Sequence, residues 1–485
     1  MEEPKQERDD NDERKIEIEE NGSSFLHLKR RIGLVGAASF VVGVVIGSGI
    51  FVSPKNVLVY SGSIGLCLMI WVGVGLFVLI ISLVYAELGT AFHHSGGDYI
   101  YIKDAFGGLP AFLVVWAQAM LRTPASRTLK ALVFADYIDK VVSSTSCSIP
   151  RSIKIMIAVI EILTLAITNM ISVRLTTNIQ VFFTATKVIA LVIIGVGGIV
   201  KLAQGSFGEL TTGFEGTNED FTVVLAVYSC FFAYDGWNAI NNIAEEINQP
   251  KRNIPLALVL STLVIMTVYV LANVSYFSVL TKQEFLASWT VAYSWGQKIL
   301  GSAAIIVPIS VLCSIHGSSN GSNFGVSRIM FAASREGQLP ELMSHLHVNS
   351  LIPTFSIAFS TCISLLMLIP ADIGQLINFV GFVTFILVCG TMAANIKFRL
   401  TMKEYSPVFK VPLFVPMICI LILLFLLIVP FVHKPQTEFL YGLAFVVGGL
   451  ILYPLVYFKL QIPGYYHVTV FFQLLMNIAP PAKRE

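Results

Sequence analysis

Charged residues are scarce in this chain, and that scarcity indicates its class. Only 13% of the 485 residues are Asp, Glu, Lys or Arg, whereas 55% are hydrophobic and the mean hydropathy is +0.75. Soluble domains carry about a quarter charged residues, so the composition predicts an all-α polytopic membrane protein. The net charge of +2 and the lack of a basic cluster give no indication of nucleic-acid binding.

Catalytic and metal-binding motifs are also missing from the sequence. The histidine pairs His93–His94 and His345/His347 lack a complete ligand set at a fixed spacing. No nucleophile–base set and no phosphate-binding loop occurs. We therefore expect neither an enzyme nor a bound cofactor or metal.

The distribution of charge predicts the domain boundaries. Ten of the 30 acidic residues lie between Glu2 and Glu20, beside four basic ones. Such a segment cannot bury a core, so residues 1–31 are predicted to be a disordered tail. The apolar run that begins near Ile32 is too long for a cleavable signal peptide. Residues 32–459 then form the membrane domain, and 460–485 form a C-terminal tail.

Apolar segments of bilayer length recur along the membrane domain, and the sequence predicts twelve spans. Their approximate bounds are 32–60, 64–92, 105–141, 153–171, 175–201, 220–244, 254–281, 299–332, 352–370, 373–397, 411–430 and 438–459. An even number places both termini on one side of the membrane. Lys and Arg are more frequent in the connectors of that side, which predicts cytoplasmic termini.

Two of these spans are interrupted at their middle. Gly47-Ser48-Gly49 breaks the first, and the stretch from Phe232 to Asn238 breaks the sixth. Irregular backbone at membrane depth is tolerated only where protein covers it or where it lines a cavity. A glycine pair alone would also fit close helix packing. Two breaks five spans apart instead indicate an inverted-repeat transporter with its ligand site near the midplane.

The motifs at these breaks resemble the light subunits of heteromeric amino acid transporters, in the amino acid–polyamine–organocation superfamily. The matching stretches are IGSGIFVSPK at 46–55, YAELGT at 85–90, FAYDGWN at 232–238 and SREGQLP at 334–340. The resemblance runs from about Ile32 to Lys459. Within the family it is greatest to the branch that handles neutral and dibasic amino acids and cystine.

The resemblance implies a twelve-helix LeuT-type fold with a 5+5 inverted repeat, in which helices 1 and 6 are broken. It implies sodium-independent exchange at the plasma membrane. It also implies a disulfide between Cys147 and a single-span glycoprotein heavy chain. Cys147 lies in a polar stretch on the predicted outer side, where the alternative is a free surface thiol. The sequons at Asn21, Asn273 and Asn320 fall in the tail or in spans, so we expect none to be glycosylated.

The resemblance also implies how an amino acid substrate binds. Backbone N–H groups around Ser48 to Ile50 would hold its carboxylate, and carbonyls of the second break would hold its ammonium. Phe232 occupies the position of an aromatic gate. The implied substrate-binding residues are Ile46, Ser48, Gly49, Ile50, Phe232, Ala233, Asp235 and Gly236.

Two buried charges have functional and structural interpretations. Asp235 would be a counter-ion for a cationic side chain or a coupling element, or else the partner of a resident Lys or Arg. Lys187 would replace the sodium ion of sodium-coupled relatives with a fixed ammonium. The alternative for Lys187 is a lysine that extends to the membrane interface.

The third span departs from the family pattern because it carries Arg122, Arg127 and Lys130. Cations in lipid are costly, so the arginines are expected to reach Asp235 or Asp136, or to face a water-filled vestibule. Glu161 is another candidate partner. If a resident cation neutralises Asp235, neutral substrates are favoured over cationic ones.

Smaller polar groups have less specific interpretations. Ser318, Ser319 and Asn320 could line the site, but helix–helix hydrogen bonds are the favoured interpretation. Asn378 and Thr384 are expected to point inward.

Exchange of neutral amino acids, large or aromatic ones included, is the leading functional hypothesis. Its alternatives are exchange of cationic amino acids and cystine for neutral ones, and a non-transporting sensor or orphan partner.

Overall fold

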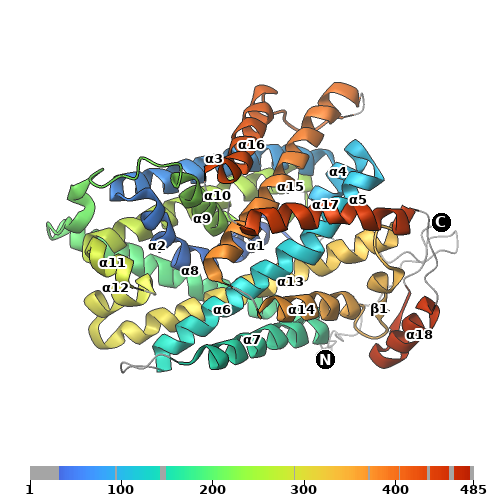
Figure 1. Ribbon diagram of the computed structural model, residues 1–485, viewed down its shortest axis with the longest axis horizontal. Coiled ribbons are helices and arrows are strands. Elements are labelled where there is room, and N and C mark those ends of the chain that lie inside the picture. The colour runs from blue at the N-terminus through green and yellow to red at the C-terminus, as the bar shows by residue number, and fades with distance from the viewer. Residues whose placement is uncertain are drawn as a thin grey trace, which may run out of the picture.

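The computed structural model describes residues 32–92, 96–142, 149–288, 290–369, 372–402, 405–433, 437–457 and 464–480. This part of the chain is almost entirely helical, and most long helices run along the long axis of the molecule (Figure 1). The α-helices are α1 (Leu34–Val45), α2 (Gly49–Ser61), α3 (Ile64–Ala91), α4 (Asp98–Phe106), α5 (Gly108–Ala117), α6 (Thr123–Val142), α7 (Arg151–Ile171), α8 (Val173–Ala203), α9 (Val223–Tyr234), α10 (Pro250–Val279), α11 (Lys282–Ala287), α12 (Val291–Leu300), α13 (Ile306–Arg335), α14 (Thr354–Met367), α15 (Ile373–Thr401), α16 (Phe414–His433), α17 (Thr437–Tyr457) and α18 (Tyr465–Met476). Short 3-10 or π segments are η2 (Gln118–Arg122), η3 (Gly208–Thr212), η4 (Trp237–Glu246), η5 (Gly301–Ile305) and η6 (Glu341–Ser344), and the strands are β1 (Leu346–His347) and β2 (Ile478–Ala479).

The described helices confirm a polytopic membrane protein. Eight of them are long and apolar enough to cross a membrane, and the number is ten if each of two bent pairs counts as one span. The other two predicted spans have helices as well. The third consists of α5, the π turn η2 and the cation-bearing α6, and the ninth is α14, which has only 14 residues.

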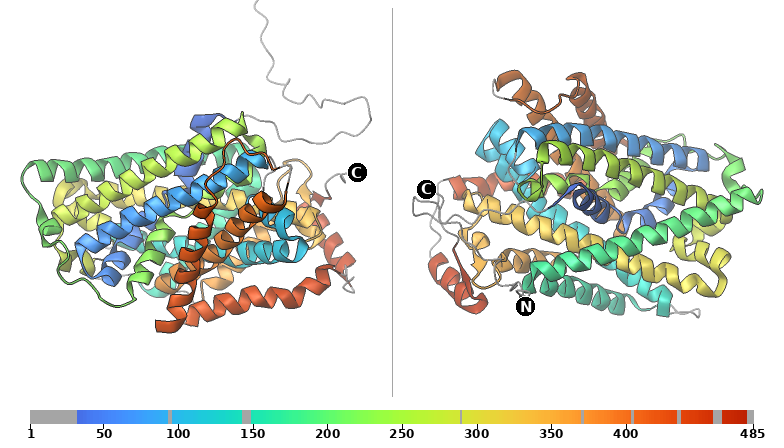
Figure 2. Two further views of the ribbon diagram at one scale, coloured as in Figure 1. Left: turned by 90° about the horizontal axis from the view of Figure 1, so that it is seen from above. Right: turned by 180° about the vertical axis from the view of Figure 1, so that it is seen from behind.

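Both predicted breaks are present. The helices α1 and α2 are bent by 48° across residues 46–48, and α9 and η4 are bent by 44° across residues 235–236. The helix α2 packs along α9, and α1 packs against η4, so the two broken segments lie side by side. The helices α3, α8, α10, α13 and α15 surround them (Figure 2). This arrangement places the interrupted backbone inside the bundle, as an irregular membrane segment requires.

The outer helices present apolar side chains to their surroundings. Ile160 and Ile167 on α7, Val196 on α8 and Leu421 on α16 are all more than half exposed. In contrast, 67% of the span window of α15 is buried inside the protein. Because an extended apolar surface marks contact with lipid or with a partner, this belt agrees with a bilayer around the bundle.

Part of the predicted C-terminal tail is folded. Helix α18 contacts α14 through a T-shaped pair of Phe355 and Phe472, and β2 pairs antiparallel with β1, which lies between α13 and α14. His345 contributes by a 3.0 Å hydrogen bond between its Nε2 and Nε2 of Gln473. The 12-residue helix is too short to span a bilayer, so its hydropathy did not indicate a transmembrane element. Residues 1–31 and Cys147 lie outside the described residues.

Candidate functional site

The first break leaves backbone donors without acceptors. Helix α1 ends at Val45, Ile46 turns to an extended conformation with ψ of 95°, and α2 begins at Gly49. Within the described chain, the N–H groups of Ser48, Gly49 and Ile50 donate to no acceptor. These are the donors at the N-terminus of a helix, where the helix dipole favours an anion. The geometry therefore fits a carboxylate at this point.

The second break presents carbonyl groups and Asp235. Helix α9 ends at Tyr234, Asp235 is extended, and Gly236 has a φ of +112° that favours glycine. The Tyr269 hydroxyl lies 3.0 Å from the Ala233 carbonyl oxygen and 3.2 Å from that of Val45, so it can donate to either. Tyr269 thus links the two broken segments, a role that its position in an otherwise apolar span did not indicate.

The two breaks approach each other closely. A Cβ atom added to Gly49 would lie 2.4 Å from the Ala233 Cα atom, so a larger residue would push the segments apart. A Cβ atom added to Gly47 would lie 2.4 Å from Ser318 Oγ on α13. Gly49 is therefore required by the packing of backbone against backbone, whereas a larger residue at position 47 would have to displace the Ser318 side chain.

A small cavity of about 20 Å³ lies between the breaks and opens to solvent. The hydroxyl groups of Ser48 and Ser318 are buried there and have no hydrogen-bond partner among the described residues. Buried polar groups are normally satisfied, so unpartnered hydroxyls in a cavity indicate that a ligand or water completes them. The lining consists of Val44, Val45, Gly47, Ser48, Gly49, Ser126, Lys130, Phe232, Asp235 and Ser318.

Asp235 has a resident partner. Arg122 Nη2 lies 2.5 Å from Asp235 Oδ1, and Arg122 Nε donates to Thr384 Oγ1 at 2.7 Å. Arg122 ends the π turn η2, a local widening of the helix that often marks functional positions. The side chains of the pair are only 12% and 16% exposed. The aspartate is therefore already paired with a cation that belongs to the protein.

Lys187 reaches the first break from α8. Its fully buried Nζ donates to the Gly43 carbonyl oxygen at 2.6 Å and to the Ile46 carbonyl oxygen at 2.8 Å. These carbonyls lie at the C-terminal end of α1, where the helix dipole favours a cation. Lys187 is thus buried inside the bundle and does not extend to the membrane interface.

Comparison with known proteins agrees with this geometry. Residues 32–453 match the family model described as amino acid permease. The chain belongs to the amino acid permease family. It is 37% identical over 477 residues to the human b(0,+)-type amino acid transporter 1, covering 97% of both chains. It is 40% identical over 437 residues to the mouse large neutral amino acids transporter small subunit 2, covering 89% of this chain and 82% of that protein.

The relatives confirm the resemblance that the motifs indicated. The permease is a multi-pass membrane protein of amino acid transport, and its relatives are transporters rather than enzymes. Of the predicted substrate residues, Ser48, Gly49, Phe232 and Asp235 line the cavity, whereas Ile46, Ile50, Ala233 and Gly236 form the backbone around it.

Several predicted partners of the extra charges need correction. Glu161 forms no ion pair with the three cations of the third span. Its Oε1 lies 2.9 Å from His316 Nδ1 instead. The carboxylate of Asp136 pairs with Lys154 at 2.8 Å. Sequence order does not show that α7 packs beside both α6 and α13, and this adjacency determines both pairs.

The polar residues of α13 divide between two roles. Asn320 forms hydrogen bonds to Asn169 of α7 and to Gln180 of α8, as expected for helix–helix contacts. Ser318 instead lines the cavity, so the favoured interpretation was wrong for this residue. The sequon residues Asn273 and Asn320 are both buried.

Two residues of the motif YAELGT, Tyr85 and Glu87, take part in buried acidic clusters outside the cavity. The Tyr85 hydroxyl donates to Asp98 Oδ1 at 2.5 Å. Two residues later, Glu87 is fully buried and pairs with Arg399 at the end of α15.

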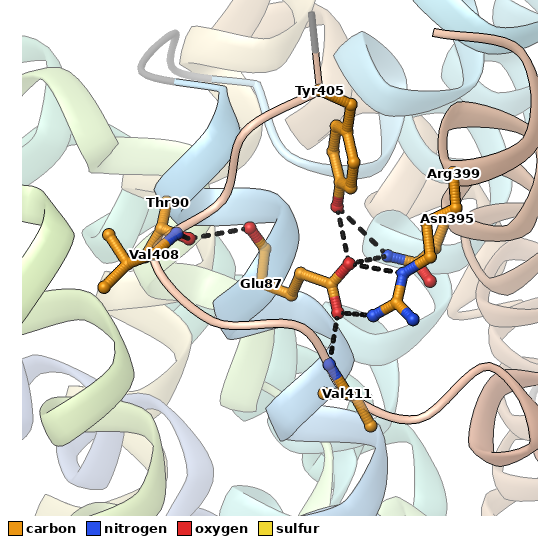
Figure 3. Close-up of polar contacts among 7 residues, drawn as sticks. All are labelled: Glu87, Thr90, Asn395, Arg399, Tyr405, Val408 and Val411. Carbon is orange, nitrogen blue, oxygen red and sulfur yellow. Dashed lines mark hydrogen bonds and ion pairs between the residues drawn. The ribbon is translucent and has the colours of Figure 1, made fainter. Parts of the chain in front are cut away.

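Figure 3 shows this second cluster, in which Glu87 accepts from several donors. Arg399 Nε lies 2.7 Å from Glu87 Oε1, the Tyr405 hydroxyl donates at 2.9 Å, and the Val411 N–H donates at 2.8 Å. Asn395 Nδ2 adds a bond of 3.1 Å. Glu87 therefore fastens the connector between α15 and α16 to the end of α3.

Proposed function

We propose that this permease is a sodium-independent exchanger of neutral L-amino acids with a twelve-helix LeuT-type arrangement. The substrate carboxylate binds the free N–H groups of Ser48, Gly49 and Ile50, and its ammonium faces the carbonyls of the second break. The observation that carries the proposal is the Arg122–Asp235 pair beside this anion site. Because the aspartate is neutralised, a cationic side chain gains no free counter-ion.

Exchange is tested by efflux. Cells that express the permease with a candidate heavy chain are preloaded with a labelled amino acid and exposed to an external panel. Efflux that requires external leucine or phenylalanine supports the proposal. If a complex shown to be at the cell surface releases no label under any condition, the non-transporting sensor is favoured instead.

A second candidate is exchange of cationic amino acids and cystine for neutral ones. Asp235 favours it, because an intramembrane carboxylate can act as the counter-ion of a cationic side chain. External arginine distinguishes the two candidates. Stimulation of efflux by arginine as strong as that by leucine would contradict the neutral specificity.

We propose that Lys187 takes the place of a coupling sodium ion. Its Nζ supplies a fixed positive charge to the unwound carbonyls of α1, as a bound cation would. Replacing external sodium with choline is expected to leave uptake unchanged. A large loss of uptake in choline would refute this role.

We also propose that the permease works at the plasma membrane with a single-span glycoprotein heavy chain joined through Cys147, and that both its termini are cytoplasmic. The small-subunit relative and the position of Cys147 between the third and fourth spans support this. On a non-reducing gel, Cys147→Ser is expected to abolish a high-mass band that the wild type shows. An unchanged band would exclude this linkage.

A further inference from the structure

The cavity contains a cation that the proposed exchange of neutral amino acids does not use. Lys130 on α6 lines the cavity together with Asp235 and Ser318, and its side chain is 8% exposed. Its Nζ donates to Ser322 Oγ at 3.1 Å. A lysine ammonium has three N–H donors, so one neutral hydroxyl leaves most of its hydrogen-bonding capacity unused.

No acidic side chain in the described part of the chain forms an ion pair with Lys130. Asp235, the acid of the same cavity, is paired with Arg122. The neighbouring Arg127 adds a further buried positive charge, and it donates to Thr361 Oγ1 at 3.2 Å while its Nε has no partner among the described residues. Buried charges are normally paired, and Lys130 lines the cavity without an acidic partner of its own.

Helix geometry explains why Lys130 faces the cavity and Arg127 does not. Arg122, Ser126 and Lys130 follow one another at intervals of four residues, which places them on one face of the helix. Arg127 lies outside this series and points to Thr361 on α14. Arg122 is occupied by Asp235, so Lys130 is the cation of this face that remains available to a ligand.

The unpartnered hydroxyls of Ser48 and Ser318 provide an independent indication of a ligand in the same cavity. Ser48 lies at the N-terminus of α2, where the α-carboxylate of a substrate would bind. Lys130 comes from a different helix, so it can contact another part of the same molecule. A second anionic group on the substrate would satisfy it.

We infer that Lys130 binds the side-chain carboxylate of an acidic amino acid, so that aspartate or glutamate is a further substrate class of this permease. This inference rests on the proposed exchange function and extends it. A neutral amino acid leaves Lys130 on Ser322, whereas an acidic one pairs with it. The charge of the occupied cavity is then balanced by the substrate.

The first test uses the wild-type permease with its heavy chain. External glutamate is compared with glutamine, which has the same shape but no side-chain charge, in efflux of a preloaded labelled amino acid. Glutamate is expected to stimulate efflux at a lower concentration than glutamine. If leucine stimulates efflux and glutamate does not, the inference is refuted and the proposed function stands. If no amino acid stimulates efflux, the proposed function itself fails.

The second test measures selectivity in variants. Lys130→Met is expected to raise the ratio of the KM for glutamate to that for leucine by about ten- to a hundredfold, the range for hydrogen bonds to charged groups. Lys130→Arg keeps the charge and should retain most of the selectivity. The control is Lys251→Met, at an exposed lysine in the first turn of α10, which should leave the ratio unchanged. An unchanged ratio in Lys130→Met at the cell surface would overturn the inference, and the wild-type comparison decides the matter if that variant does not reach the surface.

Discussion

The Arg122–Asp235 pair allows a direct test of the proposed preference for neutral over cationic substrates. The variant Arg122→Leu removes the guanidinium and leaves Asp235 facing the cavity without its partner. The freed carboxylate can then bind the side chain of external arginine. A hydrogen bond to a charged group is worth about 1.5–3 kcal/mol, so the KM for arginine is expected to fall by about ten- to a hundredfold.

The same substitution has a cost in stability. Removing one partner of a buried ion pair typically costs about 3–5 kcal/mol, because the remaining charge is uncompensated. The side chains of the pair are 12% and 16% exposed, which favours the lower end of that range. The double variant Arg122→Leu/Asp235→Asn removes both charges, so it should recover most of the lost thermal stability and lose the new acceptance of arginine.

The assay is efflux stimulated by arginine and by leucine, normalised to surface expression, for the wild type, both single variants and the double variant. The coupling energy between Arg122 and Asp235 is the effect of the double variant minus the sum of the effects of the two single variants. Arg122→Leu at the cell surface with leucine exchange but no gain in arginine exchange would refute the idea that the resident pair determines this exclusion.

Two further predictions concern the charges outside the cavity lining. Glu87→Gln should destabilise the purified complex by about 3–5 kcal/mol, because it leaves Arg399 unpaired in a buried cluster. The control Glu284→Gln breaks an exposed ion pair with Lys298 and should lower the stability by less than about 1 kcal/mol. If thermal unfolding shows equal losses, the Glu87 cluster does not stabilise the fold. Lys187→Met should abolish stimulated efflux at normal surface expression, since it removes the donor to the Gly43 and Ile46 carbonyls. Full activity in this variant would show that transport does not need these hydrogen bonds.

The breaks were predictable because glycine and aspartate in the middle of apolar spans are costly unless they serve a site. The resident pair was predicted only as one of several alternatives. Which acid Arg122 reaches depends on the π turn that ends at this residue and on the packing of α6 against α15, and neither follows from a regular helical period. The prediction that Glu161 pairs with a cation of the third span was wrong. Its partner His316 comes from a helix far along the chain, and sequence order does not show that the two helices are neighbours. Helix α18 was not predicted because a short apolar helix cannot be distinguished from a tail by sequence alone. Its contact with α14 identifies it as a folded element.

The charges of the cavity also suggest why transport would be exchange rather than net flow. An empty cavity leaves the N–H groups of Ser48 to Ile50, the hydroxyl of Ser318 and the ammonium of Lys130 to water. Closing the site around an empty cavity would remove that water without replacing its hydrogen bonds, so closure is favoured only when an amino acid is bound. We therefore expect slow efflux into medium without amino acids, and faster basal efflux in Lys130→Met, since this variant has one charge fewer to desolvate. Measuring label release into amino-acid-free buffer checks both. Equal basal release by the wild type and this variant, at equal surface expression, would show that desolvation of Lys130 does not limit return of the empty permease.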